Sequence, residues 1–338
     1  MTLFDGPILA LETSCDETSA AVVVGRKVVS NAVSSQIELH KKWGGVVPEA
    51  AARAHVEALL PIIEEALSSS SLELTDIKAI AVTNRPGLVG ALSVGVTAAK
   101  ALAFARRLAI VGIHHLEGHL FSVFGGGDEV SFPHVALIVS GGHTELVRVR
   151  GIGKYTVLGQ TLDDAAGEAF DKGARLMGLG YPGGRAIQEA AKGGDPKRYP
   201  LPRGLSGDTC DFSFSGLKTA VLRLVEKEGD RLSVPDAAAS LQETIVSVLS
   251  QRALRAAEDS AAEVLTLVGG VAANEALRER ISRACQTKGI AFVTPPIDLC
   301  TDNAAMIGLA ASFRLAAGER HGHDLDALPN APLPGLEL

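Results

Sequence analysis

Short apolar runs that alternate with polar turns open the chain, and this pattern predicts β-strands. The first fifty residues contain the runs PILALET, AAVVVG and KVVSNAVSS, with the polar turn SCDETS after the first of them. Residues 134 to 159 repeat this order as HVALIVS, the turn GGHT, ELVRVRG and YTVLGQ. Short β-rich runs divided by Gly, Asp and Ser are typical of hairpins. We therefore expect three successive strands near the start of each half of the chain.

A helical pattern follows each set of strands. It reads VPEAAARAHVEALLPIIEEAL in the first half and LDDAAGEAFDKGARLMGLG in the second. Each half continues with a buried strand and a Gly-rich turn into a helix, IKAIAVTNRPGLVGALSVGVTAAKALAFA or AEVLTLVGGVAANEALRERISRAC. A last strand closes each half, LAIVGIH or IAFVTPP. The order βββαβαβ thus occurs twice, which predicts two mixed-sheet α/β domains related by duplication.

These patterns also predict the domain boundaries. We expect an N-terminal domain at 1–132 and a C-terminal domain at 133–310, with a helical insertion at about 185–255. Residues 311–338 should form a closing helix and a mobile Pro-rich tail. Two such domains enclose a cleft, and Gly-rich turns at strand ends offer N–H groups to anions. A nucleotide held by the turns SGGHT, LVGGVAANEAL and SCDETS is the physical expectation.

Composition and charge limit the class of protein. A chain of 338 residues suits two domains, and 46% hydrophobic with 21% charged residues is typical of a globular protein. We find no uninterrupted apolar stretch of the ~18 residues that a membrane helix needs, and no basic leader at the start. The four cysteines form no Cys-x-x-Cys pair, which favours a reducing cytoplasm. A net charge of −7 argues against non-specific coating of nucleic acid.

The stretch HHLEGHL, residues 114 to 120, offers candidate metal chemistry. His115 and His119 are four apart, so both imidazoles lie on one face of a helix. In zinc proteases the catalytic glutamate directly follows the first histidine. Here Glu117 would lie about 200° around the helix from both histidines, pointing away from a metal. The spacing alone leaves a metal pair and an ordinary helical pair both open, and it argues against a protease base.

The chain resembles the TsaD (formerly Gcp) family of tRNA threonylcarbamoyltransferases from about residue 8 to about residue 315. The resemblance rests on many motifs in order: LETSCDETSAAVV, GGVVPEAAARAHVE, RPGLVGALSVG, HHLEGHL, VSGGHTEL, DDAAGEAFDKGARLMGLGYPGG, DFSFSGLKTAV, GGVAANEALR and CTDNAAMIG. It implies two duplicated actin/hexokinase-like (ribonuclease-H-like, ASKHA) domains around a central cleft. Agreement along a whole chain is far more specific than one glycine loop.

The resemblance also implies the reaction and its partners. Members of this family transfer the threonylcarbamoyl group of threonylcarbamoyl-AMP to N6 of adenosine 37, in tRNAs that read codons beginning with adenine, and release AMP. The product is called t6A. The implied partners are tRNA, a TsaB-like paralogue and a TsaE-like ATPase in the cytoplasm, with no membrane. A zinc metalloprotease and a small-molecule kinase of the same superfold are the alternative functions.

The family motifs imply which residues form the site. The metal ligands, catalytic through the metal, are His115, His119 and Asp302. This set leaves coordination positions open for a substrate, and Fe(2+) is the ion we expect, with Zn(2+) also accepted. The implied adenylate-binding residues are Ile138, Val139, Ser140, Gly141, Gly142, Asp171, Gly184 and Asn274. By analogy Asp16 and Glu17 lie on the phosphate side or couple to a partner.

Two positions depart from the family pattern. Arg85 stands in a turn where members commonly have glycine, and Gln188 stands where many have an acid. The second change puts one nucleotide-side contact in doubt without affecting the predicted fold.

Overall fold

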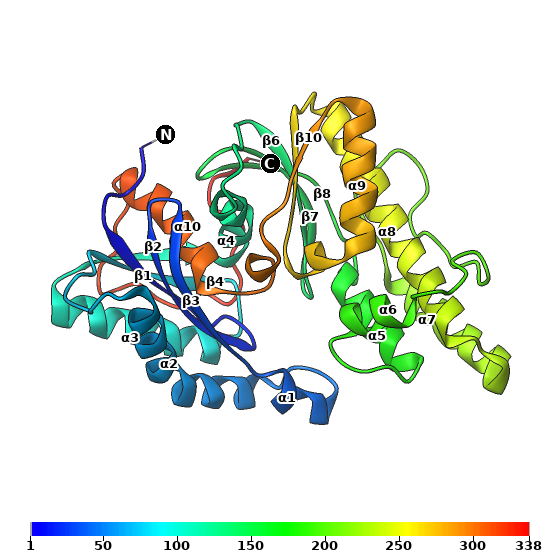
Figure 1. Ribbon diagram of the computed structural model, residues 1–338, viewed down its shortest axis with the longest axis horizontal. Helices are drawn as coiled ribbons and strands as arrows, with labels where there is room; N and C mark the ends of the chain where they lie inside the picture. The colour runs from blue at the N-terminus through cyan, green and yellow to red at the C-terminus, as the bar shows by residue number, and fades with distance from the viewer. Residues whose placement is uncertain (1, 338) are drawn as a thin grey trace. The chain divides into compact units, whose positions relative to one another are not determined.

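The computed structural model describes residues 2–337, and these divide into two compact units (Figure 1). Unit 1 holds the chain up to Glu129 together with Ile152–Lys154 and Pro295–Leu336. Unit 2 holds Val130–Gly151 and Tyr155–Thr294. The boundaries predicted at 132 and 310 were drawn from the repeated order of strands and helices, whereas these units are defined by contacts between residues. The predicted boundaries therefore stay a proposal.

Unit 1 is built on a five-stranded mixed sheet in the order β3-β2-β1-β4-β5. The strands are β1 (Pro7–Glu12), β2 (Glu17–Val24), β3 (Lys27–Ser35), β4 (Ala79–Arg85) and β5 (Ala109–His114). The first three pair antiparallel, whereas β1, β4 and β5 pair parallel. Helices cover both faces, which explains why β1 and β4 are buried along nearly their whole length and begin with apolar runs.

Helices of unit 1 sandwich this sheet. The helices are α1 (Ile37–His40), α2 (Pro48–Ser70), α3 (Val89–Arg106), α4 (His115–Ser122) and α10 (Ala304–Ala316), with short 3-10 turns η1 (Lys41–Trp43), η2 (Val123–Gly125) and η5 (Ile297–Leu299). The side chains of Leu9 and Leu11 pack with those of α2 and α3 in one core. On the other face, Gly308 of α10 meets Val23 and Ala10, where an added Cβ would lie 2.6 Å from the valine. The helix α10 begins at Ala304, earlier than the closing helix predicted after residue 310.

Unit 2 repeats this sheet order, with β10-β9-β6-β7-β8 in the places of β5-β4-β1-β2-β3. The strands are β6 (His134–Val139), β7 (Thr144–Gly151), β8 (Lys154–Gln160), β9 (Val264–Val268) and β10 (Ala291–Val293), and the short β11 (Leu336–Glu337) extends the edge beside β8. As in unit 1, the first pair is antiparallel and the pairs with β9 are parallel. The repeat predicted from the hydrophobic pattern is therefore present in the strand order.

The helices of unit 2 include the segment predicted as an insertion. They are α5 (Ala166–Leu176), α6 (Gly183–Ala190), α7 (Ser215–Glu228), α8 (Val234–Asp259) and α9 (Glu275–Lys288), with the turns η3 (Gly229–Arg231) and η4 (Gly270–Ala273). A carboxylate fastens α7 to the strand-to-helix loop before α5. Asp163 accepts hydrogen bonds from the backbone N–H groups of Phe214 and Ser215, at 2.7 and 3.2 Å.

Among the described residues, only α3 is long and apolar enough to cross a membrane by length and composition. In unit 1 this helix packs against β4 and α2. It is the covering helix that the sequence predicts after the turn RPGLVG, and such helices pass the same test in globular folds.

The Pro-rich tail, which the sequence predicts to be mobile, packs on unit 1 through its backbone. His321 N–H donates to Ile110 O at 2.9 Å, and Leu328 N–H donates to Asn84 O at 2.8 Å. Further on, Ala331 O lies 3.0 Å from His114 Nε2. The expectation came from proline content, but prolines also suit an extended segment that hydrogen-bonds to a neighbouring strand.

A buried histidine at the start of β6 makes the stability of unit 2 depend on pH. Burial lowers the pKa of His134 to about 4, although its Nδ1–H donates to Ser131 O at 3.0 Å. Between pH values of about 6.5, the ordinary pKa of histidine, and about 4, His134 binds a proton in the unfolded chain but not in the folded chain. The stability of the folded chain therefore falls as the pH drops through this range.

We predict that lowering the pH from 7 to 5 costs about 2 kcal/mol of unfolding free energy through His134 alone. The variant His134→Asn keeps a donor for Ser131 O and removes the titrating ring. The unfolding free energy that this variant loses between pH 7 and pH 5 should therefore be smaller by that amount. Urea unfolding of both proteins at the two pH values measures this, and equal losses would contradict it.

Candidate metal centre

The helix α4 presents two histidines on one face. It starts directly after β5, where His114 caps it by accepting a hydrogen bond from Leu116 N–H at 3.2 Å. His115 and His119 follow one turn apart, and their ring centroids are 4.8 Å apart. Every residue of α4 is buried. Two imidazoles in a buried helix need polar partners, because burial of an unpaired polar group is costly.

Asp302 reaches these rings from the loop before α10. Asn303 caps α10 by accepting a hydrogen bond from Met306 N–H at 3.0 Å, which fixes the end of the loop that carries Asp302. The helices α4 and α10 meet at Gly118, where an added Cβ would lie 2.7 Å from Ile307 Cδ1. Glycine at this position therefore leaves room for the end of the Ile307 side chain.

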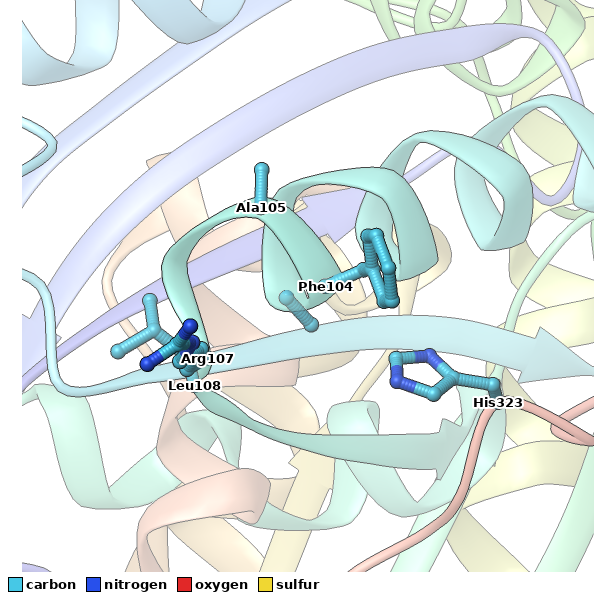
Figure 2. A pocket seen from close by; sticks show the side chains of 6 residues that line it. Phe104, Ala105, Arg107, Leu108 and His323 are labelled. Atoms are coloured by element: carbon cyan, nitrogen blue, oxygen red, sulfur yellow. The ribbon is translucent and has the colours of Figure 1, made fainter.

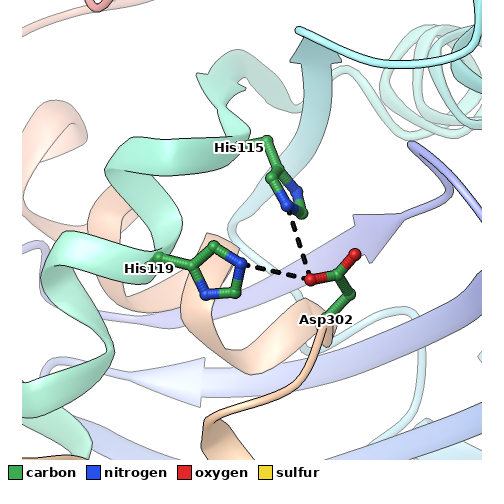
Figure 3. Close-up of side chains that lie close together, drawn as sticks. All are labelled: His115, His119 and Asp302. Carbon is green, nitrogen blue, oxygen red and sulfur yellow. Dashed lines mark hydrogen bonds and ion pairs between the residues drawn. The ribbon is translucent and has the colours of Figure 1, made fainter. Parts of the chain in front are cut away.

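The three side chains converge on one carboxylate oxygen (Figure 3). Asp302 Oδ1 lies 3.4 Å from His115 Nε2 and 3.1 Å from His119 Nε2. One ligand atom from each residue fits within 4.8 Å of the others. The structure thus brings together the two histidines predicted from their spacing and the aspartate implied by the family motif.

Glu12 holds the other side of the His115 ring. This side chain, at the end of β1, is fully buried, and its Oε2 lies 3.2 Å from His115 Nδ1. The same carboxylate accepts hydrogen bonds from Thr83 Oγ1 at 2.6 Å and from Ser14 N–H at 2.6 Å. A carboxylate that accepts the Nδ1–H of a histidine turns the Nε2 lone pair toward a metal.

The charges of the cluster fit a cation. Burial opposes ionisation of Asp302, but the His115 charge and its hydrogen bonds lower the pKa of this carboxyl well below its usual range. Burial likewise opposes the charge on His115, yet Asp302 and Glu12 together raise its pKa well above 6.5. In His119 burial dominates and lowers the pKa. Two carboxylates thus favour a positive charge at this place.

The donor set also fits a metal ion that binds substrate. Two imidazole nitrogens and one carboxylate oxygen match borderline divalent ions such as iron and zinc, and three ligands leave coordination positions open. His119 Nδ1 is buried and has no hydrogen-bond partner among residues 2–337, which leaves its Nε2 as the nitrogen that faces the cluster.

The turn SCDETS lies beside the cluster. Burial, together with the charges of Asp16 and Asp302, raises the pKa of Glu17. Burial and the same two carboxylates raise the pKa of Cys15, which makes its thiol a poor nucleophile. Neighbouring acids also disfavour direct contact with a phosphate, so this turn suits a cation or a partner better than an anion.

Glu117 has a structural role and not that of a protease base. Its Oε1 and Oε2 accept hydrogen bonds from Arg314 Nη2 and Nε, at 2.6 and 2.9 Å. Arg314 also pairs with Glu319 at 2.7 Å. Both oxygens of Glu117 are thus engaged by Arg314, in agreement with a side chain that the helical geometry places away from His115 and His119. The metalloprotease alternative therefore lacks its catalytic base.

The residues predicted to bind an adenylate gather at one end of the unit 2 sheet. The turn after β6 contains Gly141 and Gly142, where an added Cβ would meet nothing within 4 Å. The turn after the parallel neighbour β9 lies beside it, because an added Cβ on Gly269 would come within 2.4 Å of Val139 O. Carboxyl ends of parallel strands are the usual place for nucleotides in such sheets.

Burial and existing hydrogen bonds limit the contacts that three of these predicted residues can make with a ligand. The side chains of Ile138 and Val139 are fully buried in β6, so a contact with a ligand would involve their backbone atoms. Asn274 caps α9 by accepting from Leu277 N–H at 3.0 Å, and its amide donates to Gln242 Oε1 at 2.9 Å. Ligand contact by Asn274 would have to replace or share these bonds.

Asp171 and Gly184 belong to the same end of unit 2. Asp171 Oδ1 accepts a hydrogen bond from Gly183 N–H at 2.7 Å, which holds the start of α6 against α5. An added Cβ on Gly184 would meet nothing within 4 Å. Gln188, one of the departures from the family pattern, accepts a hydrogen bond from Glu275 N–H at 2.9 Å and so joins α6 to α9.

A hollow of about 600 Å³ lies elsewhere on unit 1, near the end of α3 (Figure 2). Its lining residues are Ala103, Phe104, Ala105, Arg107, Leu108 and His323. None of them is a predicted site residue.

Two charged residues, Glu12 beside the cluster and Arg314 beside Glu117, were not predicted from the sequence. Glu12 follows an apolar strand that is otherwise uncharged, and a buried carboxylate at a strand end is a signal for a functional or paired group. Arg314 lies in an apolar helix, where a single cation also indicates a buried partner.

Comparison with known proteins gives one consistent match. Residues 27–309 match the family described as TsaD, tRNA N6-adenosine threonylcarbamoyltransferase. A relative with this name from Symbiobacterium thermophilum is 52% identical over 334 residues, which cover 98% of each chain. Another from Anaeromyxobacter dehalogenans is 53% identical over 327 residues, or 95% of this chain and 98% of the relative.

Solved structures support the fold alone. HypF of T. kodakarensis superposes with a TM-score of 0.62 at 12% identity, over 93% of this chain and 49% of the other. Component A of the (R)-2-hydroxyglutaryl-CoA dehydratase of Acidaminococcus fermentans gives 0.55 at 14% identity, over 92% and 99%. Together with the repeated sheet order, these likenesses confirm the predicted α/β fold class.

We predict that Glu117→Gln destabilises unit 1 by about 3 kcal/mol without reducing metal binding, because it leaves Arg314 partly unpaired in a buried place. The control Glu319→Gln removes the more exposed partner of Arg314 and should cost less. Urea unfolding and metal content measure the two effects. Loss of the metal with unchanged stability would place Glu117 in the metal centre instead.

Proposed function

Because this chain belongs to the TsaD family, it is a tRNA N6-adenosine threonylcarbamoyltransferase, and we propose that His115, His119 and Asp302 hold a divalent ion used in its reaction. The observation that supports this most is the convergence of the three side chains on one oxygen in unit 1 (Figure 3). The family match favours neither the protease nor the small-molecule kinase alternative.

We propose threonylcarbamoyl-AMP as the donor and N6 of adenosine 37 as the acceptor, in tRNAs that read codons beginning with adenine, with AMP released. The adenylate part of the donor is assigned to the unit 2 turns. Gly141, Gly142 and Gly184 support this because nothing lies where their side chains would be, so a nucleotide can approach the backbone closely. Ser140 and Asp171 supply polar atoms nearby.

The metal, when bound, would supply a template and Lewis acid for the threonylcarbamoyl end. We propose Fe(2+), and the same donors also suit Zn(2+). The chain contributes orientation: Glu12 accepts the Nδ1–H of His115 and thereby keeps Nε2 available as a ligand. Thr83 and Ser14 fix Glu12 in turn.

Positioning supplies most of the rate in this proposal, because the exocyclic amine of adenine is a weak nucleophile. None of the carboxylates beside the metal cluster is assigned as a general base. Asp16 and Glu17 are assigned instead to coupling with a partner, or to the phosphate side without direct contact with the phosphate, because their mutual repulsion and the raised pKa of Glu17 disfavour an anion.

We propose that the chain works with a TsaB-like paralogue and a TsaE-like ATPase in the cytoplasm. Exposed apolar side chains on the packed helices α2 and α3 support a protein partner. Val56 and Leu60 lie one turn apart on α2, and Val89 starts α3. These three are each more than half exposed, which suits an interface better than a free surface.

The central prediction is metal-dependent formation of t6A. Purified protein, the two partner proteins, threonylcarbamoyl-AMP and unmodified tRNA should yield the modified adenosine. Asp302→Asn should remove the bound metal and lower the rate at least a hundredfold, because it replaces a charged ligand. The exposed Asp298, in the same segment, gives the matched control Asp298→Asn, which should retain both. Absence of t6A with wild-type protein would refute the activity.

A second prediction concerns Glu12. The isosteric Glu12→Gln should weaken metal affinity ten- to a hundredfold, because the amide orients the His115 ring less firmly than a carboxylate does. Competition with a metal chelator measures the dissociation constant directly, and circular dichroism checks that the chain is folded. A folded Glu12→Gln protein with wild-type metal affinity would show that Glu12 only fills space.

A further inference from the structure

We propose that the loop of residues 36–47 binds tRNA, with Trp43 stacking on an unpaired base and Lys41 and Lys42 contacting the phosphate backbone. We call these residues the tryptophan loop. The inference deepens the proposed function, since it rests on tRNA being the substrate, and it assigns a surface to that substrate. The loop lies wholly within unit 1.

Trp43 is the one tryptophan of the chain, and 54% of its surface is exposed. It ends the turn η1, and Gly44 follows in a left-handed conformation, with φ at 68°. The side chains of Lys41 and Lys42 are exposed beside it. Single exposed apolar residues are common, so exposure alone does not indicate a site. The neighbouring cations and the rigid base of the loop are the additional observations.

A buried chain of hydrogen bonds fixes the base of the tryptophan loop. His40 is fully buried, its Nδ1 accepts from Val47 N–H at 3.3 Å, and its Nε2 lies 3.1 Å from Gln36 Oε1. Gln36 Nε2 in turn lies 3.3 Å from His55 Nδ1. The Trp43 ring lies 6.1 Å from the ring of the anchored His40 and remains half exposed, so stacking of its open face on a ligand costs little ordering entropy.

The same network ends at the turn beside the metal cluster. His55 Nε2 lies 3.0 Å from Cys15 O, and Gln36 N–H donates to Asp16 O at 3.0 Å. Ser14, in the same turn, places its Oγ 3.2 Å from His115 Nδ1, so the turn lies against the candidate metal cluster. The loop follows β3 directly, and Figure 1 shows α1 extending from unit 1 at that point.

This combination matches the chemistry of single-stranded RNA. Proteins recognise unpaired loop bases by stacking them on aromatic side chains, and lysines contact the flanking phosphates. An enzyme that reacts with an atom on a base must take this base out of its stack, which frees neighbouring bases for new contacts. Glu38 pairs with Lys41 and Glu49 with Arg53, so Lys42 is the cation of this surface with no ion pair among the described residues. In a chain with net charge −7, such a local cation matters for binding RNA.

The single tryptophan permits a direct test. An anticodon stem-loop RNA added to the chain should quench the Trp43 fluorescence, and a fully paired RNA hairpin stem of the same length should quench it less. Affinity is measured separately by anisotropy of labelled RNA, with the two partner proteins present. Trp43→Ala should weaken stem-loop binding at least tenfold. Lys42→Glu should weaken it and reduce its dependence on salt.

Phe104→Ala provides the matched control. Phe104 is also an exposed aromatic residue of unit 1, at 72%, but it lies at the end of α3 against His323. Its loss should leave RNA affinity unchanged. Equal affinity of the Trp43→Ala complex and the wild-type complex would overturn the inference, and quenching by a partner protein in place of RNA would assign the loop to protein docking.

The outcomes separate the inference from the proposed function. A wild-type complex that binds no RNA and forms no t6A refutes the activity as a whole. A wild-type complex that forms t6A, with Trp43→Ala and Phe104→Ala indistinguishable from it in RNA binding, refutes only the role of the tryptophan loop.

Discussion

The contact between α4 and α10 is the constraint on which the metal centre depends. Gly118 lies at this contact, where an added Cβ would come within 2.7 Å of Ile307 Cδ1 and displace the end of that side chain. The start of α10 then brings Asp302 to the two histidines, and its other end brings Arg314 to Glu117. One helix is thus held at both ends by groups of opposite charge. A buried charge without a partner is costly. Each of the two pairs therefore favours the same placement of α10 against α4.

Glu12 extends this arrangement into the sheet. It joins the end of β1 to His115, and Thr83 joins it to β4. His115, one of the proposed metal ligands, is therefore supported by the two parallel strands β1 and β4. A site on such rigid elements holds its geometry with little loss of conformational entropy when substrate binds. Burial and the fixed hydrogen bonds of the whole cluster, more than any single side chain, determine that a positive charge is favoured at this place.

Local patterns were enough to predict the sheets and the histidine pair, because both depend on residues close together in the sequence. Asp302 could be assigned only by family resemblance, since it lies 183 positions from His119 and meets it through helix packing. Glu12 and Arg314 escaped prediction for the same reason. The family motif implies a ligand-binding role for every residue from 138 to 142. It does not reveal that the side chains of Ile138 and Val139 are buried, because their burial results from the neighbouring strands of the sheet. Proline content suggested a mobile tail, and the backbone bonds that hold it leave no pattern in its own residues.

The duplicated scaffold explains why the two units suit different chemistry. The turn after β1 and the turn after β6 occupy equivalent places, but the first carries Asp16 and Glu17 and the second carries Gly141 and Gly142. Two carboxylates repel a phosphate, whereas glycines expose backbone N–H groups to it. In unit 1, Asp302 and Glu12 favour the positive charge at His115, beside the turn that carries Asp16 and Glu17. We therefore propose that acidic side chains in unit 1 and glycines in unit 2 let the same strand order bind a cation in one unit and an anion in the other.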